Sequence, residues 1–503
     1  MKTNKHRILY LLLLGGSLTL GSCAKLLEEE KHSFVDADGF FKSESQCIAA
    51  LNGCYIDLTN IYAADLMVSI EAVTDLAFLN SSNLDAKLEI SPANPGMGDN
   101  VWTACYRGVM YCNAAIAGIE KAKIAEDRKP ALKGEAVALR ALYYYILTSN
   151  FGDVPFYTAD VNSLDVLETI GKLGRMNASE TRTALINELK EYAPKLPQTR
   201  TSEVKDNRIS ASLAYMLIGK LALWNKDYAT CESAMEEIRK IYGQLVQYPL
   251  TDMYFRNKNT PESIFEVQYT WSAAGLKKTS TVAAFFTPTK ASGTSVYDGV
   301  DIPELGNAAN PFNSITPSEY MMSLYDLADP RKEIILAYSY NGTWFKRPMA
   351  NNGTGKAWMG PKFWCPGMTN IADGNNQKVF RYADALLMLA EAANETGNTD
   401  LAMQCINEVK SRANADFVLT AYPGKTEFLE EVKKERAREL MGEYGRKWDL
   451  VRWGDWFRAI QETIATEYPV IKDNALPYHE FYPIPDKEVM RSNGILTNPA
   501  YNQ

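Results

Sequence analysis

Apolar residues return every three or four positions along most of the chain, which is the spacing of one helix face. The pattern predicts helices over residues 37–62, 102–123, 135–148, 181–193 and 426–441. The third of these is expected to end at Asn150-Phe151-Gly152-Asp153-Val154-Pro155, where Gly-Asp and Pro interrupt helical structure. The chain is therefore expected to be mainly α-helical.

Two helix pairs place small and apolar residues at the same offsets. The matching positions are Ile218, Gly219, Ala222, Cys231, Met235 and Ile238 in one pair, and Leu389, Ala390, Ala393, Ala402, Ile406 and Val409 in the other. Small residues at a crossing point let two antiparallel helices approach closely, which is typical of tetratricopeptide units. Because the pairs lie far apart in the sequence, we interpret them as repeats embedded in one larger fold.

The stretch 250–378 has a different composition, with frequent Gly, Pro, Asn, Thr and aromatic residues. Residues 263–270 alternate as a strand does, and 317–327 favour a short helix. The rest of the stretch is expected to form loops and short strands. Long loops on a rigid scaffold commonly carry binding residues, so we expect a loop-rich ligand face with little β structure here.

The N-terminus has the pattern of a secretory signal peptide over residues 1–22. Lys2, Lys5 and Arg7 precede an apolar run at 8–14 and then small residues. The run is too short for a transmembrane helix, and no later segment is apolar enough to span a bilayer. Leu20-Gly21-Ser22-Cys23 resembles a bacterial lipobox, which implies that Cys23 is lipidated and becomes the first mature residue. The alternative is a secreted protein in which Cys23 is incidental.

Residues 23–35 are expected to form a lipidated tether. Glu28, Glu29 and Glu30 follow closely on Cys23 and resemble the surface-export signal of Bacteroidota lipoproteins. That resemblance implies an outer-membrane protein anchored by lipid and exposed on the cell surface. The alternative interpretation of these charges is a solvated linker only.

Charge and composition exclude several classes of function. The formal net charge is −8, which disfavours binding to nucleic acid. Only three histidines and eight cysteines occur, with no CxxC pair, so the sequence offers no metal site and indicates no cofactor. Cys47 and Cys54, like Cys105 and Cys112, are too far apart along one helix to form a disulfide. A bridge between two helices stays open.

Four groups of residues resemble the SusD/RagB family. They are Gly134-Glu135-Ala136 through Pro155; Phe380-Arg381-Tyr382-Ala383-Asp384 with Leu389-Ala390-Glu391-Ala392; Glu435-Arg436 through Arg452-Trp453-Gly454; and Phe481-Tyr482-Pro483-Ile484-Pro485 with Asn498-Pro499-Ala500-Tyr501. Ala500 departs from the usual Gly, which affects only the local turn. The resemblance implies a SusD-like fold over residues 36–503, with a helical part at 36–249, a loop-rich insertion at 250–378 and a C-terminal helical part at 379–503.

The same resemblance implies a function. Family members bind oligosaccharides, and some bind peptides, as a lid on a SusC-like TonB-dependent transporter, with the repeat-bearing side as the natural partner surface. We therefore expect a nutrient-binding lipoprotein and not an enzyme. Scarce histidine and the absence of HExxH and GxSxG motifs argue against a surface hydrolase such as a glycosidase. A purely structural interaction lipoprotein is the third hypothesis.

Candidate ligand contacts come from loops, because an exposed aromatic ring covers a sugar's apolar face while polar side chains bond its hydroxyls. The candidate platforms are Trp271, Tyr297, Tyr340, Trp344, Trp358 and Trp364, and the candidate polar contacts are Asp75, Asn80, Asn83 and Asn100. The alternative for each aromatic residue is a place in the core, which is our expectation for Trp102. Arg381, Arg446 and Arg452 are expected to pair with Glu435, Glu439 and Asp449, and a catalytic pair at Glu435 and Glu439 is the alternative.

Overall fold

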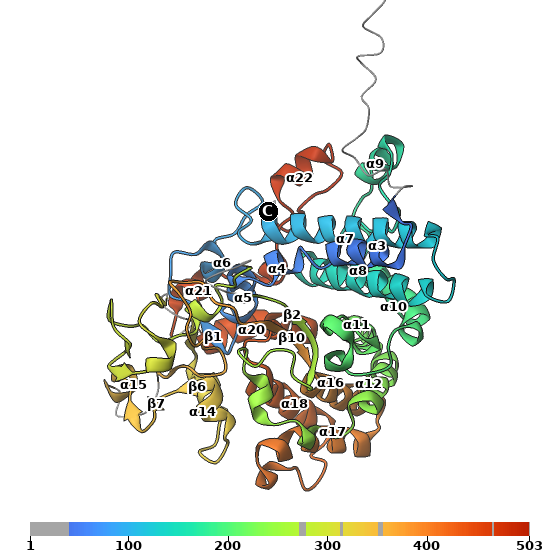
Figure 1. Cartoon of the computed structure of the whole chain (residues 1–503). Helices are drawn as coiled ribbons and strands as arrows, with labels where there is room; N and C mark the ends of the chain where they lie inside the picture. Colours follow the sequence, from blue (N-terminus) through green and yellow to red (C-terminus); the bar gives the residue numbers. More distant parts are fainter. Residues whose placement is uncertain (1–39, 271–277, 312–314, 351–355, 465–466, 502–503) are drawn as a thin grey trace, which may run out of the picture.

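The computed structural model describes residues 40–270, 278–311, 315–350, 356–464 and 467–501. Helices dominate this part of the chain, and its strands form five two-stranded antiparallel sheets. Figure 1 shows the helical scaffold in the upper, central and right-hand parts of the molecule, with a loop-rich lobe at the lower left.

The first helical layer comes from the N-terminal part. Its helices are α3 (Glu44–Gly53), α4 (Leu58–Ile61), α5 (Ala64–Glu71), α6 (Leu84–Lys87), α7 (Gly98–Lys121) and α8 (Lys129–Phe151). The continuous helix predicted at 37–62 is wrong, because α3 ends at Gly53, a poor helix former, and a turn separates it from α4. α7 and α8 approach closely at Gly108 because glycine has no Cβ. A Cβ there would lie 2.2 Å from the ring of Tyr143. Trp102 is buried, as expected.

The repeat-bearing side contains α9 (Leu164–Gly171), α10 (Ala178–Tyr192), α11 (Ala211–Trp224), α12 (Tyr228–Tyr242), α16 (Tyr382–Thr396), α17 (Thr399–Ala413) and α18 (Lys425–Leu440). The two predicted helix pairs are α11–α12 and α16–α17, and α12 packs directly on α16. Gly219 lies at this junction, since a Cβ there would meet the terminal methyl groups of both Met235 and Met388. The pairs are thus consecutive layers in space although they are distant in sequence.

One central sheet joins the two halves of the chain. β2 (Ser263–Val267) pairs antiparallel with β10 (Gln377–Arg381), and α16 follows β10 directly. The sequence predicted a strand beginning at Ser263, and the structure ends it at Val267. All five residues of β2 are buried. This sheet fixes the start of the second helix pair.

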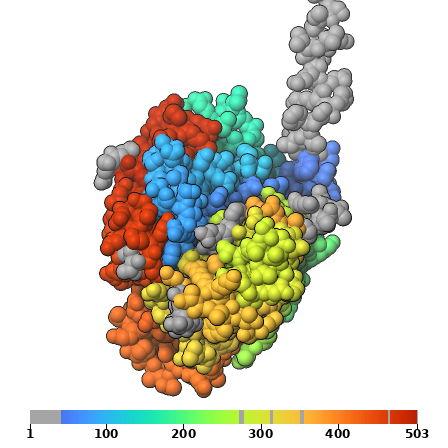
Figure 2. All heavy atoms as spheres, turned by 90° about the vertical axis from the view of Figure 1, so that its left-hand side faces the viewer, coloured from blue at the N-terminus to red at the C-terminus, as the bar shows by residue number. Residues whose placement is uncertain are grey.

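The loop-rich lobe comprises residues 283–371 and has its own hydrophobic cluster. Its short elements include β3 (Val296–Tyr297), β4 (Val300–Asp301), β5 (Thr316–Pro317), α13 (Glu319–Ser323), α14 (Arg331–Ile335), β6 (Leu336–Ala337), β7 (Ser339–Tyr340), β8 (Thr343–Trp344), α15 (Lys346–Ala350) and β9 (Trp358–Met359). β5 pairs with β1 (Ala77–Phe78), which ties the loop after α5 to the lobe. Figure 2 shows the lobe on one face, below the N-terminal segment drawn in blue.

The C-terminal part closes the scaffold with α19 (Arg446–Trp453), α20 (Trp456–Ala459), α21 (Pro469–Asn474) and α22 (Asp486–Arg491). Tyr482 then donates its backbone N–H to Asn150 O at the end of α8. The two segments that resemble the family at residues 150–155 and 481–485 therefore meet in space. Among the described residues, no helix combines the length and the apolar character that crossing a membrane requires.

Candidate functional site

Arg381, the last residue of β10, is fully buried at the centre of an ion-pair network. Its guanidinium donates to Glu262 at 2.8 Å, to Glu439 at 3.1 Å, and to both carboxylate oxygens of Glu443 at 2.7 and 2.8 Å. A buried cation without such partners would cost several kcal/mol, on the order of the desolvation of one ion. The network therefore holds β10 and α18 in one arrangement.

The network continues through Arg331, which is equally buried. Arg331 donates to Asp329, to Glu435 at 2.6 Å and to Glu439 at 3.0 Å. Burial disfavours the charged carboxylate of Glu435, but the nearby cations outweigh burial and lower its pKa to about 2. A general acid or base works best with a pKa near the operating pH. Glu435 and Glu439 thus serve the scaffold, and the geometry gives no support to a catalytic pair.

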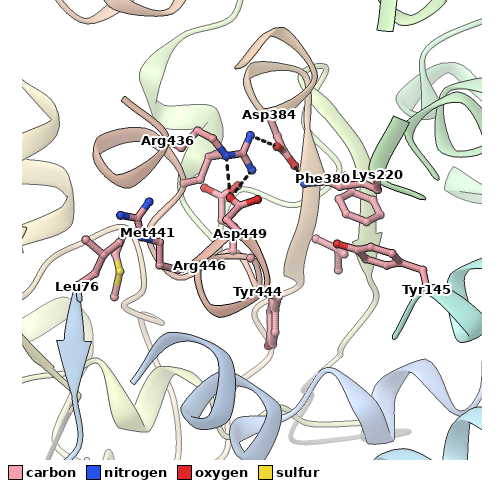
Figure 3. A pocket seen from close by; sticks show the side chains of 14 residues that line it. Leu76, Tyr145, Lys220, Phe380, Asp384, Arg436, Met441, Tyr444, Arg446 and Asp449 are labelled. Atoms are coloured by element: carbon pink, nitrogen blue, oxygen red, sulfur yellow. Dashed lines mark hydrogen bonds and ion pairs between the residues drawn. The ribbon is translucent and has the colours of Figure 1, made fainter. Parts of the chain in front are cut away.

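A second network surrounds an enclosed cavity of about 20 Å³, shown in Figure 3. Arg436 donates to Asp384 at 2.8 Å and to Asp449 at 2.7 Å, while Lys220 lies 2.6 Å from the other oxygen of Asp384. Arg452 joins it by donating to Asp449 at 2.9 Å. A cavity of this size holds about one water molecule and no sugar ring. The expected pairing within the family-like motifs is confirmed for Arg381 with Glu439 and for Arg452 with Asp449.

Asp75 belongs to this buried framework and is not a ligand contact, which corrects our expectation. Its two carboxylate oxygens accept from Arg446 at 2.6 and 2.8 Å, and its side chain is nearly inaccessible. The loop-like sequence around Asp75 gave no sign of this partner because Arg446 lies 371 positions later. Arg446 therefore pairs with Asp75 and not with the acidic residues of its own motif.

Three of the predicted aromatic platforms are core residues of the lobe, so the expectation that they are exposed is wrong. Trp364 is only 1% exposed and donates its indole N–H to Met359 O at 3.1 Å. Trp358 donates to Asp298 at 2.8 Å, and its ring lies under the guanidinium of Arg347. Tyr297 is fully buried with its hydroxyl on Gly306 O. Each ring has an internal partner for its polar atom, which is what allows its burial.

Trp344 is the candidate platform that the structure leaves open. It lies in the β7–β8 hairpin, whose turn residues Asn341 and Gly342 both have positive φ, as a tight two-residue hairpin requires. Successive side chains alternate between the faces of a strand, and Tyr340 packs inward on Trp364 at 5.8 Å. Trp344 pairs with Ser339 on the opposite face and is 45% exposed. The hairpin thus presents one indole to solvent from a packed base.

The remaining candidate ligand residues differ in the contacts that their side chains make within the fold. Asn83 caps α6 by accepting from Ala86 N at 3.0 Å, and Asn100 donates to Asn60 O at 3.0 Å, so both have structural contacts. Asn80 is exposed just after β1, and no contact of its side chain appears in the described part of the chain. Trp271 lies outside the described residues, as does Cys23. The structure does not bring Asn80, Asn83 or Asn100 into the hairpin.

The described cysteines, residues 47, 54, 105, 112, 231, 365 and 405, are all buried and none forms a disulfide. They fill space as small apolar side chains do. The fold is therefore held by packing and ion pairs in this part of the chain.

The geometry defines a class of protein: a helical scaffold with embedded repeats, fixed by buried charges, that carries a loop-rich lobe with an exposed aromatic hairpin. The model of the SusD family matches residues 338–501, and the model described as starch-binding associating with outer membrane matches residues 40–223. The chain belongs to the SusD/RagB family.

Individual proteins show the same similarity. SusD-like protein P25 of Formosa agariphila is 25% identical over 523 residues, covering 96% of each chain. A SusD superfamily protein from Bacteroides vulgatus superposes with a TM-score of 0.71 at 22% identity, covering 91% of this chain and 99% of that one. The surface glycan-binding protein A of Bacteroides thetaiotaomicron, solved in complex with laminarihexaose, superposes with a TM-score of 0.69 at 20% identity, covering 90% and 99%. The predicted SusD-like, mainly α fold is confirmed.

Proposed function

We propose that this protein is a cell-surface lipoprotein that captures an oligosaccharide and passes it to a SusC-like TonB-dependent transporter in the outer membrane. Lipidation at Cys23 would keep the protein beside that transporter, since several acyl chains anchor a protein durably. A peptide is the less favoured ligand. The family similarity supports association with the outer membrane and binding of glycans.

The observation that carries the proposal is the exposed indole of Trp344 on the β7–β8 hairpin. A ring held by a packed hairpin offers a flat apolar face to a sugar at a small cost in side-chain entropy. Ser339 pairs with Trp344 on the same face, and the exposed Asn341 lies in the adjoining turn; both carry groups that bond hydroxyls. In the similar Bacteroides thetaiotaomicron protein, the bound molecule is laminarihexaose.

A binding role without catalysis fits the charges of the scaffold. The carboxylates Glu435 and Glu439, the catalytic pair considered as an alternative, are paired with arginines and buried away from solvent. A glycosidase needs two carboxyl groups that flank an accessible bond. We therefore prefer capture over hydrolysis, and we prefer it over a purely structural role because that role would need no exposed indole on the hairpin.

A glycan array combined with a peptide panel tests the proposal. We expect the purified protein to retain at least one oligosaccharide and to leave it intact during prolonged incubation, as judged by chromatography. The matched control for the hairpin variant Trp344→Ala is Leu164→Ala, which truncates an exposed apolar side chain on α9 and should not alter retention. Steady release of shorter sugars would favour the hydrolase, and retention of peptides alone would replace the oligosaccharide.

The transporter partnership needs a separate test in the native membrane. We expect affinity purification of the full-length protein to recover a TonB-dependent barrel, and Cys23→Ser to remove the protein from the outer-membrane fraction. Recovery of a different protein in place of the barrel would favour the structural interaction lipoprotein. A Cys23→Ser protein that stays membrane-bound would contradict lipid anchoring at this residue.

A further inference from the structure

An open pocket lies where the end of α8, the first turns of α10, the end of α11 and the C-terminal tail meet, far in the sequence from the hairpin. Its volume is about 350 Å³. Partly buried aromatic rings of Trp224, Tyr478, Phe481 and Tyr501 contribute to its wall, with Phe151 buried behind them. The charged residues that line it are Asp153, Arg175, Arg182 and Glu480.

Arg182 differs from the arginines of the scaffold networks. It is only 6% exposed, yet no carboxylate forms an ion pair with it in the described part of the chain. One nitrogen donates to Thr148 O at 3.1 Å, the guanidinium lies 4.5 Å from the ring centroid of Trp224, and Nε has no partner among the described residues. Burial lowers the pKa of Arg182 to about 10. Arg331, Arg381 and Arg436, which are as deeply buried, each contact at least two carboxylates.

Arg175 provides the second cation of the pocket, and it too is held only by dipoles. Its three nitrogens donate to the backbone oxygens of Asp153 at 2.8 Å, Thr497 at 2.8 Å and Phe151 at 3.0 Å. These bonds orient the guanidinium firmly but do not neutralise its charge. The pocket therefore contains two fixed cations whose charge no carboxylate contacts directly.

The two acidic residues of the pocket reduce this positive charge without cancelling it at close range. Asp153 accepts from Ala178 N at 2.8 Å, and it acts on both arginines only from beyond ion-pair distance. Glu480 makes no hydrogen bond or ion pair within the described ranges, and burial raises the pKa of its carboxyl. Glu480 therefore opposes an incoming anion, which gives the pocket a residue whose removal should strengthen binding.

We propose that this pocket binds an acidic sugar unit, in which a carboxylate or sulfate group meets Arg182 and the sugar ring packs on the aromatic wall. Guanidinium groups bind both anions through charge-assisted hydrogen bonds, and aromatic rings cover the apolar face of a sugar. A peptide is disfavoured because none of the lining residues belongs to a strand whose edge would pair with peptide backbone. The inference stands independently of the hairpin and of the proposed function.

Titration of the full-length mature protein at low ionic strength tests the assignment, with trigalacturonic acid as the acidic probe. The matched neutral probe is the same trisaccharide with its carboxyl groups reduced, and a sulfated galactose trisaccharide tests the second anion. We expect binding of an acidic probe and about tenfold weaker binding of the neutral one. Equal binding of acidic and neutral probes, binding of neither acidic probe, or binding of tetraglutamate in their place would overturn the proposal.

Two variants with opposite expected effects locate the site. Arg182→Gln should weaken binding of the acidic probe about tenfold, and Glu480→Gln should strengthen it about threefold. Because Arg182 has no carboxylate partner, its replacement should leave no orphaned buried anion, and the melting temperature should stay close to that of the wild type. If Arg182→Gln does not fold, Glu480→Gln decides alone, and unchanged or weaker binding overturns the site. Trp344→Ala should retain acidic-probe binding, which separates the pocket from the hairpin.

Discussion

In the helical scaffold, the deepest side chains include Arg381, Glu262 and Glu439, which are charged, and Arg381 contacts both carboxylates directly. In the lobe at 283–371, the large buried side chains include Tyr297, Trp358 and Trp364, each with one polar atom bonded inside. The scaffold is thus specified by charge pairs between segments that are distant in sequence. The lobe's own cluster is formed mainly by aromatic packing within one stretch, while Arg331 of α14 ties the lobe to the scaffold through Glu435 and Glu439.

This difference between the two regions bears on where a ligand can bind. A buried charge network tolerates little movement because each displaced partner leaves an uncompensated ion. A lobe with its own small hydrophobic cluster can carry loops of different shape on the same base. We infer that the scaffold keeps the lobe in place and that the lobe carries the ligand contacts of the hairpin.

The largest effect should come from removing the central cation of the scaffold. Arg381→Met leaves Glu262, Glu439 and Glu443 buried without this partner, and we expect the free energy of unfolding to fall by about 3–5 kcal/mol in urea denaturation. The matched control is Arg128→Met, which breaks the exposed pair with Glu44 and should cost less than about 1 kcal/mol. Similar losses in both variants would remove the distinction between buried and exposed charge pairs.

The lobe should respond locally to the loss of a core ring. Trp358→Ala removes a buried indole and its bond to Asp298, a change that typically costs about 3–5 kcal/mol, here confined to the lobe cluster. We expect limited proteolysis to cut first within residues 283–371 while the scaffold helices stay protected. Cleavage that begins in α16 or α18 would show that the two regions unfold together.

Lys447 differs from the paired cations of the scaffold, because no carboxylate contacts it in the described residues. It donates to His479 O at 2.8 Å between the rings of Trp456 and Tyr482, and burial lowers its pKa to about 7. The unfolded chain keeps this proton up to about pH 10.4, so the free energy of unfolding should rise with pH between about 7 and 10. Lys447→Met should lower this slope by up to about 1.4 kcal/mol per pH unit.

Denaturation series at pH 6, 8 and 10 measure that slope. The variant should gain more stability at pH 6 than at pH 10, because the folded wild type is penalised where Lys447 is charged. Parallel curves for wild type and variant across this range would show that Lys447 is not the titrating group.

Much of the scaffold could be predicted from the sequence because its signals are local. The spacing around Gly219 predicted a close helix crossing, and the motif at Phe380-Arg381-Tyr382 predicted a paired arginine. The partner of Asp75 could not be predicted, since Arg446 approaches it only in the folded chain. Arg182 gave no signal either, because the lack of a carboxylate partner is a property of the packed structure.

The candidate site was harder to predict because the sequence around a buried aromatic residue can look the same as the sequence around an exposed one. Trp344 and Trp358 lie 14 positions apart in similar surroundings of Gly, Asn and Lys. What separates them is Asp298, which accepts from the indole of Trp358, and the alternation of the β7–β8 hairpin, which turns Trp344 outward. Neither relation is visible before the lobe is folded.

The most direct test of the account is a calorimetric titration of Trp344→Ala with an oligosaccharide that the wild-type protein retains. We predict at least a tenfold loss of affinity, about 1.4 kcal/mol, with the melting temperature unchanged because the ring is 45% exposed and lies outside the lobe's hydrophobic cluster. Unchanged affinity would contradict the assignment of binding to the hairpin, and a loss of affinity accompanied by unfolding of the lobe would contradict the claim that this indole is free of the core.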